Sequence, residues 1–320
     1  MRMRAAFCGL LLAVAANVNA EERQVSLDWL KIVAFAAHQT DYSGVFVYEY
    51  DNRVETSHII HVVEADGEHE KLESLDGPKR KIIRHHGQVW CYINHKMVQV
   101  DSQQVRIRFP AFLPEQISTL SANYRAEQIG VARAAGYNAQ VILFEPKDNL
   151  RYAHKIWAHT GSGLLLKAAV LGDKNQVIEQ YAFTQLQIGG NIDRSWIGAT
   201  APGDGLPVSP EALKGGTPIN SGWTVDALPS GFKKTMEIQR SMRGRHAPVT
   251  QIVFSDGLSA ISVFIEPDDG EDEDNVSGLS SRGAINLYHK VVAGQLFTVV
   301  CEVPARTVIQ VLDSIRHKGK

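Results

Sequence analysis

The chain has 320 residues and carries 33 Lys and Arg against 35 Asp and Glu, a formal net charge of −2. This balance, without a block of basic residues, argues against a nucleic-acid partner, because phosphate binding depends on clustered cations. The composition, 44% hydrophobic and 8% aromatic, is that of ordinary globular domains, and the length predicts two of them.

The first 20 residues have the pattern of a secretory signal peptide. Arg2 and Arg4 precede an apolar run from Ala5 to Ala16, and Val18-Asn19-Ala20 gives a small-residue cleavage pattern. A transmembrane helix needs about 20 apolar residues, so an uncleaved anchor is the weaker alternative. We therefore expect residues 1–20 to be removed and the mature protein to be soluble and periplasmic.

The mature chain begins with a predicted helix, followed by many predicted strands. Ser26 can cap a helix from Leu27 to about His38. Strand-like runs joined by turn dipeptides such as Asp51-Asn52 follow it, and hairpins of this kind build antiparallel sheets. Strands are expected at Val45–Tyr50, Val54–Glu64, Glu68–Leu75, Lys81–His85, Gln88–Ile93, Lys96–Val100, Tyr124–Ala132, Tyr137–Glu145, Arg151–His159, Leu164–Leu171 and Val177–Ile188. A short helix is expected at Glu115–Ser121, behind Pro114.

The predicted fold class is mainly β, with an α+β arrangement in two domains. So many hairpins form one large sheet, which must curl to bury a face, and residues 21–189 are therefore expected to make an antiparallel half-barrel wrapped around helices. Residues 190–221 are rich in Gly, Pro, Ala, Asn and Ser and carry no strand or helix pattern, so they predict a linker. Residues 222–320 predict a smaller α+β domain with a closing helix after Pro304. Its strands are expected at Lys234–Arg240, Thr250–Phe254, Ser259–Ile265, Ala284–Val292 and Gln295–Val303.

The sequence does not display the motifs of an enzyme or a metal site. His58 and His61 are three apart, which in a strand puts them on opposite faces. The acidic run from Asp268 to Asn275 does not place Gly and Glu where a calcium loop requires them. No Gly-x-Ser-x-Gly elbow, P-loop or dinucleotide fingerprint occurs. We therefore expect no catalysis, cofactor or metal, although a scattered triad would leave no such motif.

Aromatic residues in the strands are candidates for lining an apolar gap between the sheet and its helices. The candidates are Phe46, Tyr48, Tyr50, Tyr152 and Trp157, and the alternative for each is ordinary core packing. The strand around Trp157 alternates imperfectly, and we place its side chain between sheet and helices.

Two cysteines remain in the mature chain, Cys91 and Cys301, one in each predicted domain. A disulfide between them would join the domains. The favoured alternative is two buried thiols, because sequence does not place their Cα atoms within disulfide distance.

One stretch is specific enough to suggest a family. The residues from Pro146 to Lys167, which begin Pro-Lys-Asp-Asn-Leu-Arg-Tyr, resemble the RseB/MucB family of periplasmic sigma-factor regulators. The resemblance extends to Tyr42–Tyr48, Leu75–Arg80 and Phe254–Ser259, with Phe264, and so covers nearly the whole mature chain.

The resemblance implies a non-enzymatic regulator whose N-terminal domain is similar to the lipoprotein carriers of the Lol pathway. Such a protein binds the periplasmic domain of a membrane-spanning anti-sigma factor, shields it from proteolysis and is released by a lipid or lipopolysaccharide-like amphiphile. The alternative is a periplasmic lipid or lipoprotein carrier or chaperone without a regulatory partner. The extra domain and the long linker favour the regulator, since a carrier needs only the cavity. The identity of the ligand, the residues that contact the partner and assembly as a homo-oligomer stay open.

Overall fold

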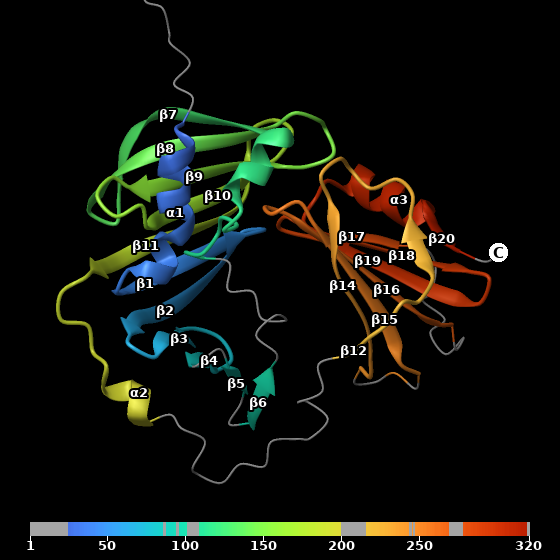
Figure 1. The fold of residues 1–320 in the computed structure, drawn as a ribbon, viewed down its shortest axis with the longest axis horizontal. Coiled ribbons are helices and arrows are strands. Elements are labelled where there is room, and N and C mark those ends of the chain that lie inside the picture. Colours follow the sequence, from blue (N-terminus) through green and yellow to red (C-terminus); the bar gives the residue numbers. More distant parts are fainter. Residues whose placement is uncertain are drawn as a thin grey trace, which may run out of the picture.

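The computed structural model describes residues 25–85, 88–93, 96–100, 109–199, 216–242, 245, 247–268 and 278–318. The predicted signal peptide, most of the predicted linker and most of the acidic run after Pro267 lie outside these ranges. Within them, no helix is both long and apolar enough to cross a membrane. The described chain is mainly β, and two large antiparallel sheets with few helices lie side by side (Figure 1).

The first sheet has 11 strands in the order β6-β5-β4-β3-β2-β1-β11-β10-β9-β8-β7. All neighbours pair antiparallel, and the pairing of β1 with β11 joins two meanders into one sheet. Asp51 and Asn52 close the first hairpin with φ of 46° and 60°, a conformation that Asp and Asn tolerate. The strands confirm the predicted meander: β1 (Tyr42–Tyr50), β2 (Arg53–Glu64), β3 (Gly67–Ser74), β4 (Arg80–His85), β5 (Gln88–Ile93), β6 (Lys96–Val100), β7 (Tyr124–Ala134), β8 (Tyr137–Pro146), β9 (Ala153–His159), β10 (Leu165–Leu171) and β11 (Val177–Ile188).

Helix α1 (Leu27–Gln39) lies across one face of this sheet (Figure 1). Ser26 caps it, and its Oγ accepts a hydrogen bond from the Trp29 backbone N–H at 3.2 Å. Leu30 and Val33 of α1 are buried in one core with side chains of the sheet. The expected short helix is present as the 3₁₀ helix η1 (Ile117–Ala122), and it packs into the same core.

The segment predicted to be a linker without helix or strand is partly structured, which corrects that expectation. Helix α2 (Ser195–Ala199) and strand β12 (Thr217–Pro218) both lie within residues 190–221. Ile192 and Trp196 are buried on Ile60 and Val62 of β2, whose neighbour Ile59 belongs to the core under α1. Because side chains alternate along a strand, α2 covers the face opposite α1. Two apolar anchors hold this segment, and its Gly- and Pro-rich composition concealed them.

The second sheet has seven strands in the order β12-β14-β15-β16-β19-β18-β17. Its strands are β14 (Lys233–Arg240), β15 (Val249–Ser255), β16 (Ala260–Pro267), β17 (Gly278–Arg282), β18 (Ile285–Val292) and β19 (Gln295–Cys301), together with β12. The predicted closing helix is α3 (Ala305–Asp313), whose Val308, Val311 and Leu312 are buried against this sheet. A separate two-stranded ladder pairs β13 (Trp223–Val225) with β20 (Ile315–His317). The sequence did not predict β17 or β20.

Candidate functional site

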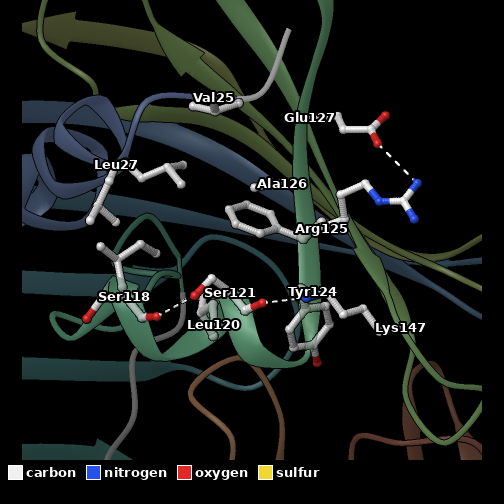
Figure 2. Close-up of a pocket in the computed structure, with 13 residues that line it drawn as sticks. Val25, Leu27, Ser118, Leu120, Ser121, Tyr124, Arg125, Ala126, Glu127 and Lys147 are labelled. Atoms are coloured by element: carbon white, nitrogen blue, oxygen red, sulfur yellow. Dashed lines mark hydrogen bonds and ion pairs between the residues drawn. The ribbon is translucent and has the colours of Figure 1, made fainter. Parts of the chain in front are cut away.

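A pocket of about 550 Å³ lies between α1, η1 and the β7 edge of the first sheet (Figure 2). Leu27 and Leu30 of α1, Leu120 of η1 and Phe144 of β8 give it apolar walls. Its size is within the range of about 300–1,000 Å³ that small-ligand sites occupy. The pocket can therefore take an apolar chain of a small amphiphile.

Charged side chains accompany the apolar walls of this pocket. Lys147 Nζ donates to the Ser121 carbonyl oxygen at 2.8 Å. Arg125 Nη1 lies 3.4 Å from Glu127 Oε1 and 3.7 Å from Glu145 Oε2. In Figure 2 the side chains of Arg125, Glu127 and Lys147 extend to the side of β7 away from Leu27 and Leu120, so they border the pocket without facing its apolar walls. A ligand with a polar or anionic head and an apolar tail suits this combination.

A buried ion pair joins the first sheet to the second. Arg151, in the turn between β8 and β9, donates from Nη1 to Asp256 Oδ2 at 2.7 Å, and neither side chain is exposed. The Tyr124 hydroxyl donates to the same carboxylate oxygen at 2.9 Å. Burial and then the negative charge of Asp256 raise the pKa of Tyr124 well above its ordinary value, so the hydroxyl keeps its proton.

The rest of the Arg151 guanidinium is also satisfied. Nε and Nη2 donate to Asp148 at 3.1 and 2.9 Å, and Nη2 also donates to the Ser230 carbonyl oxygen at 2.7 Å. Its Cζ lies 5.4 Å from the ring centres of both Tyr124 and Phe232. Asp256 in turn accepts from the backbone N–H groups of its own turn. An ion pair that is removed from water is tolerated only when such hydrogen-bond partners surround it. This buried network therefore fixes how the two sheets meet.

The β17–β18 turn makes a second contact across the junction. The Ala284 N–H donates at 3.1 Å to Glu179, which also accepts from the Tyr48 hydroxyl at 2.9 Å. Gly283 has φ +57°, and its N–H donates to Asp51 at 2.7 Å. A Cβ on Gly283 would lie 2.8 Å from Glu179 Oε2, so this turn approaches the first sheet too closely for a side chain.

The pocket and the junction share a wall. Tyr124 lines the pocket, and its hydroxyl donates to Asp256. Leu120 also lines the pocket, and its Cδ2 lies 3.1 Å from the position of a Cβ on Gly257, in the β15–β16 turn. A ligand that displaces η1 would therefore also disturb the contacts between the sheets.

The structure brings three of the predicted aromatic residues together but places none of the five in the pocket. Phe46, Tyr48 and Tyr50 are alternate residues of β1 and face the same side as α1. Tyr48 stacks on Tyr50 with ring centres 4.6 Å apart, and Phe46 is core, 5.3 Å from Phe109. Tyr152 lies at the junction, where its hydroxyl accepts from Asn286 at 3.0 Å. Ligand contact by these side chains stays a prediction.

Trp157 does not lie between sheet and helices as expected. Its neighbours Ile156 and Ala158 belong to the core under α1, so alternation puts Trp157 on the opposite face. The ammonium groups of Lys155 and Lys167 lie 5.0 and 4.9 Å from its ring centre. The apolar stems of two lysines can cover a ring on a solvent face, which explains why the large residue misled the prediction.

Sequence reasoning missed the residues of the junction, although they stood in the stretches that carry the family resemblance. Arg151 belongs to the stretch that begins at Pro146, and Asp256 belongs to Phe254–Ser259. The available signal was the presence of such charged residues in turn sequences that contain no catalytic motif. Cys91 and Cys301 are both free thiols in the structure, and burial raises the pKa of Cys301 to about 12.

The described residues form a β-rich protein. They hold an apolar pocket with charged side chains beside it, and no group of three or more His, Cys, Asp or Glu among them could hold a metal ion. Models of the MucB/RseB N-terminal and C-terminal domains match residues 26–201 and 217–316. The chain therefore belongs to the MucB/RseB family, whose members are regulatory proteins and not enzymes.

Individual relatives match along nearly their whole length. The chain is 32% identical to the sigma factor AlgU regulatory protein MucB of Pseudomonas aeruginosa, over 99% of both chains. It is 22% identical to the sigma-E factor regulatory protein RseB of Haemophilus influenzae, over 99% of this chain and 98% of that protein. The P. aeruginosa MucA/MucB complex superposes with a TM-score of 0.73 at 30% identity, over 92% of this chain and 99% of that chain. A crystal structure of MucB superposes with a TM-score of 0.65, over 91% and 97%.

Proposed function

We propose that this protein is a periplasmic regulator that binds the periplasmic domain of a membrane-spanning anti-sigma factor. It shields that domain from proteolysis and releases it when a lipid-like signal arrives. The observation that carries the proposal is the full-length similarity to MucB, together with superposition on MucB in its complex with MucA. The TM-score is 0.73 with the MucA/MucB complex and 0.65 with the crystal structure of MucB. The periplasmic location rests on the signal-peptide pattern of residues 1–20.

The pocket beside α1 is the proposed site of the signal. Supporting this assignment are its apolar walls, its volume of about 550 Å³ and the basic side chains of Arg125 and Lys147. The first sheet is proposed to curl around α1 and η1 as a half-barrel, which leaves this space between the layers. The ligand class is an amphiphile with an acyl chain and an anionic head.

The shared wall gives the signal a route to the partner. A ligand releases the partner only if it binds the released state better than the shielding state. An acyl chain pressed against Leu120 and Tyr124 would favour a state in which η1 has moved and the hydrogen bond from Tyr124 to Asp256 is weakened. Residues 21–189 and 222–320 act as two domains in this scheme, and shielding requires both.

A protease-protection assay tests the proposal. The mature chain, residues 21–320, is mixed with the periplasmic domain of the host's anti-sigma factor and the protease that cleaves it, with and without an anionic acyl amphiphile. Wild type is expected to slow cleavage, and the amphiphile to restore it. Ala126→Trp should fill the pocket, because Ala126 lines it. This variant is expected to protect as well as wild type but to ignore the amphiphile.

Ala132→Trp is the matched control, because Ala132 is also half-buried on β7 but lies outside the pocket. It should respond to the amphiphile as wild type does. A wild-type chain that does not slow cleavage would contradict the regulatory function and favour the carrier alternative. Equal responses of the two Trp variants would move the signal to a different site.

A further inference from the structure

The face of the first sheet opposite α1 carries an aromatic and cationic patch over its middle strands. Residues that pair directly across neighbouring strands share one face of a sheet, and the registers place two such rows side by side here. The first row is Val141, Trp157, Lys167, Ala182 and Val47, and the second is Leu143, Lys155, Ala169, Gln180 and Glu49. We call these two rows the Trp157 patch. Helix α2 covers a different part of the same face, over Ile60, Ile83 and Trp90.

Two ammonium groups converge on the half-buried ring of Trp157. Lys155 Nζ and Lys167 Nζ lie 5.0 and 4.9 Å from its centre, and neither forms an ion pair within the part of the chain that the structure describes. Glu49, the carboxylate of the two rows, instead accepts a hydrogen bond from Gln180. Burial and, to a smaller extent, the charge of Lys155 lower the pKa of Lys167, although Glu49 opposes them. Like charges held this close together attract anions.

The chemistry of the Trp157 patch suits a bilayer surface better than a protein. Trp is enriched at membrane interfaces, where its ring lies at the level of the headgroups and nearby Lys side chains extend their ammonium groups towards the phosphates. Lys is instead depleted in interfaces between proteins. The strands under the patch, β1 and β8 to β11, are paired on both sides, so none of them offers a free edge to an added peptide strand.

We propose that the Trp157 patch docks the protein on an anionic phospholipid bilayer, with the Trp157 ring at headgroup depth and Lys155 and Lys167 on lipid phosphates. Loss of Arg2 and Arg4 with the signal peptide takes the formal net charge from −2 to −4, so the attraction comes from this local patch and not from the overall charge. Two lysines give a modest and reversible attraction. Docking places the chain beside a membrane-spanning partner, a consequence that rests on the proposed function, whereas the docking itself does not.

Co-sedimentation of the mature chain with lipid vesicles tests this docking surface. Wild type should sediment with vesicles of phosphatidylglycerol and phosphatidylcholine but not with phosphatidylcholine alone, and should leave the mixed vesicles at about 0.5 M salt, where the Debye length falls to about 4 Å. Lys155→Gln combined with Lys167→Gln removes both charges and should weaken binding about tenfold or more. Lys79→Gln combined with Lys233→Gln is the matched control, because it removes two exposed cations outside the patch. It should sediment as wild type does.

Quenching of indole fluorescence by lipids brominated near the headgroup end of the acyl chain keeps the test independent of the lysine variants. Trp157→Phe should remove most of the quenching that mixed vesicles cause, whereas Trp223→Phe, which changes a ring packed on Phe297, should leave it. Equal sedimentation of the two double variants, or quenching that Trp157→Phe leaves unchanged, would assign vesicle binding to a different site and overturn the proposal. A wild-type chain that stays in the supernatant would overturn it too. Protection of the soluble anti-sigma domain, measured without vesicles, decides the proposed function separately.

Discussion

Individual residues at the junction differ sharply in how much they should matter, because only some of their charges are removed from water. Arg151 and Asp256 are both fully buried, whereas Arg306 and Asp173, which also bridge the sheets, are 40% and 61% exposed. A buried charge that loses its partner costs about 3–5 kcal/mol, and an exposed pair contributes about 0–1 kcal/mol. The same chemical change should therefore have different effects at the two sites.

We predict that Asp256→Asn lowers the free energy of unfolding by about 3–5 kcal/mol, because it removes the fully buried countercharge of Arg151 and leaves only the partly exposed Asp148 beside it. Asp173→Asn, the matched exposed change, should lower it by about 0–1 kcal/mol. Urea denaturation of the two variants and wild type measures both values. Similar small losses in the two variants would mean that water reaches Arg151 in solution.

Gly283→Ala tests the close approach of the β17–β18 turn. Gly283 and Gly294 both have positive φ, of 57° and 72°, but a Cβ on Gly283 would meet Glu179 and Tyr50 whereas one on Gly294 has nothing within 4 Å. Both substitutions carry backbone strain of about 1 kcal/mol or more. We expect Gly283→Ala to lower the melting temperature further than Gly294→Ala. Equal shifts would argue that the turn does not touch the first sheet.

Among the elements, α1 is tied at its C-terminal end to β2 and β3 by a small acid–base cluster. His38 Nδ1 lies 3.0 Å from Glu68 Oε2, and His61 Nε2 lies 3.4 Å from the same oxygen. Burial opposes the charge of Glu68, but the hydrogen bonds from the two histidines outweigh it and lower the pKa of Glu68 to about 2. The hydrogen bond with Glu68 raises the pKa of His38 above its ordinary value of 6.5.

This cluster predicts a pH dependence whose sign follows from the two shifts. The raised pKa of His38 stabilises the fold below about pH 6.5 and loses its effect as pH rises through the folded value. The lowered pKa of Glu68 stabilises the fold above about pH 4.5 and loses its effect as pH falls towards 2. The stability that His38→Gln removes should therefore be larger at pH 5.5 than at pH 8.5, by urea denaturation.

His58→Gln is the control for this experiment, because burial and then the charge of Lys71 lower the pKa of His58. A lowered histidine pKa stabilises the fold above about pH 6.5 and loses its effect as pH falls, so the two variants should show opposite trends. The same trend in both would rule out a charged pair between His38 and Glu68.

The elements that local sequence could predict are those with turn dipeptides and clear periodicity. The strands of the first sheet, α1 and α3 are of this kind, because hairpin turns and a helical stripe are properties of neighbouring residues. Helix α2 and strands β12, β17 and β20 were missed, since they have only five, two, five and three residues. The junction could not be predicted either. Arg151 and Asp256 are 105 residues apart in the chain, and each lies in a turn sequence that is typical of exposed surface.

At the scale of the whole molecule, two sheets are held together by contacts and not only by the chain between them. Limited proteolysis should first cut the Gly- and Pro-rich sequence at 200–215, because α2 anchors the chain up to residue 199. The two fragments should nevertheless elute together in size-exclusion chromatography, since the junction buries Arg151 and Asp256 between them. Fragments that separate at neutral pH would contradict a stable junction. Early cuts within 45–85 would contradict the proposed domains.

In the proposed function, the chain binds an anti-sigma factor and an amphiphile reverses the binding. Its most direct test is calorimetric titration of residues 21–320 with the periplasmic domain of the host's anti-sigma factor, repeated with an anionic acyl amphiphile present. We predict saturable binding in the first titration and its loss in the second. Absence of binding at micromolar concentrations, or binding that the amphiphile leaves unchanged, would contradict it.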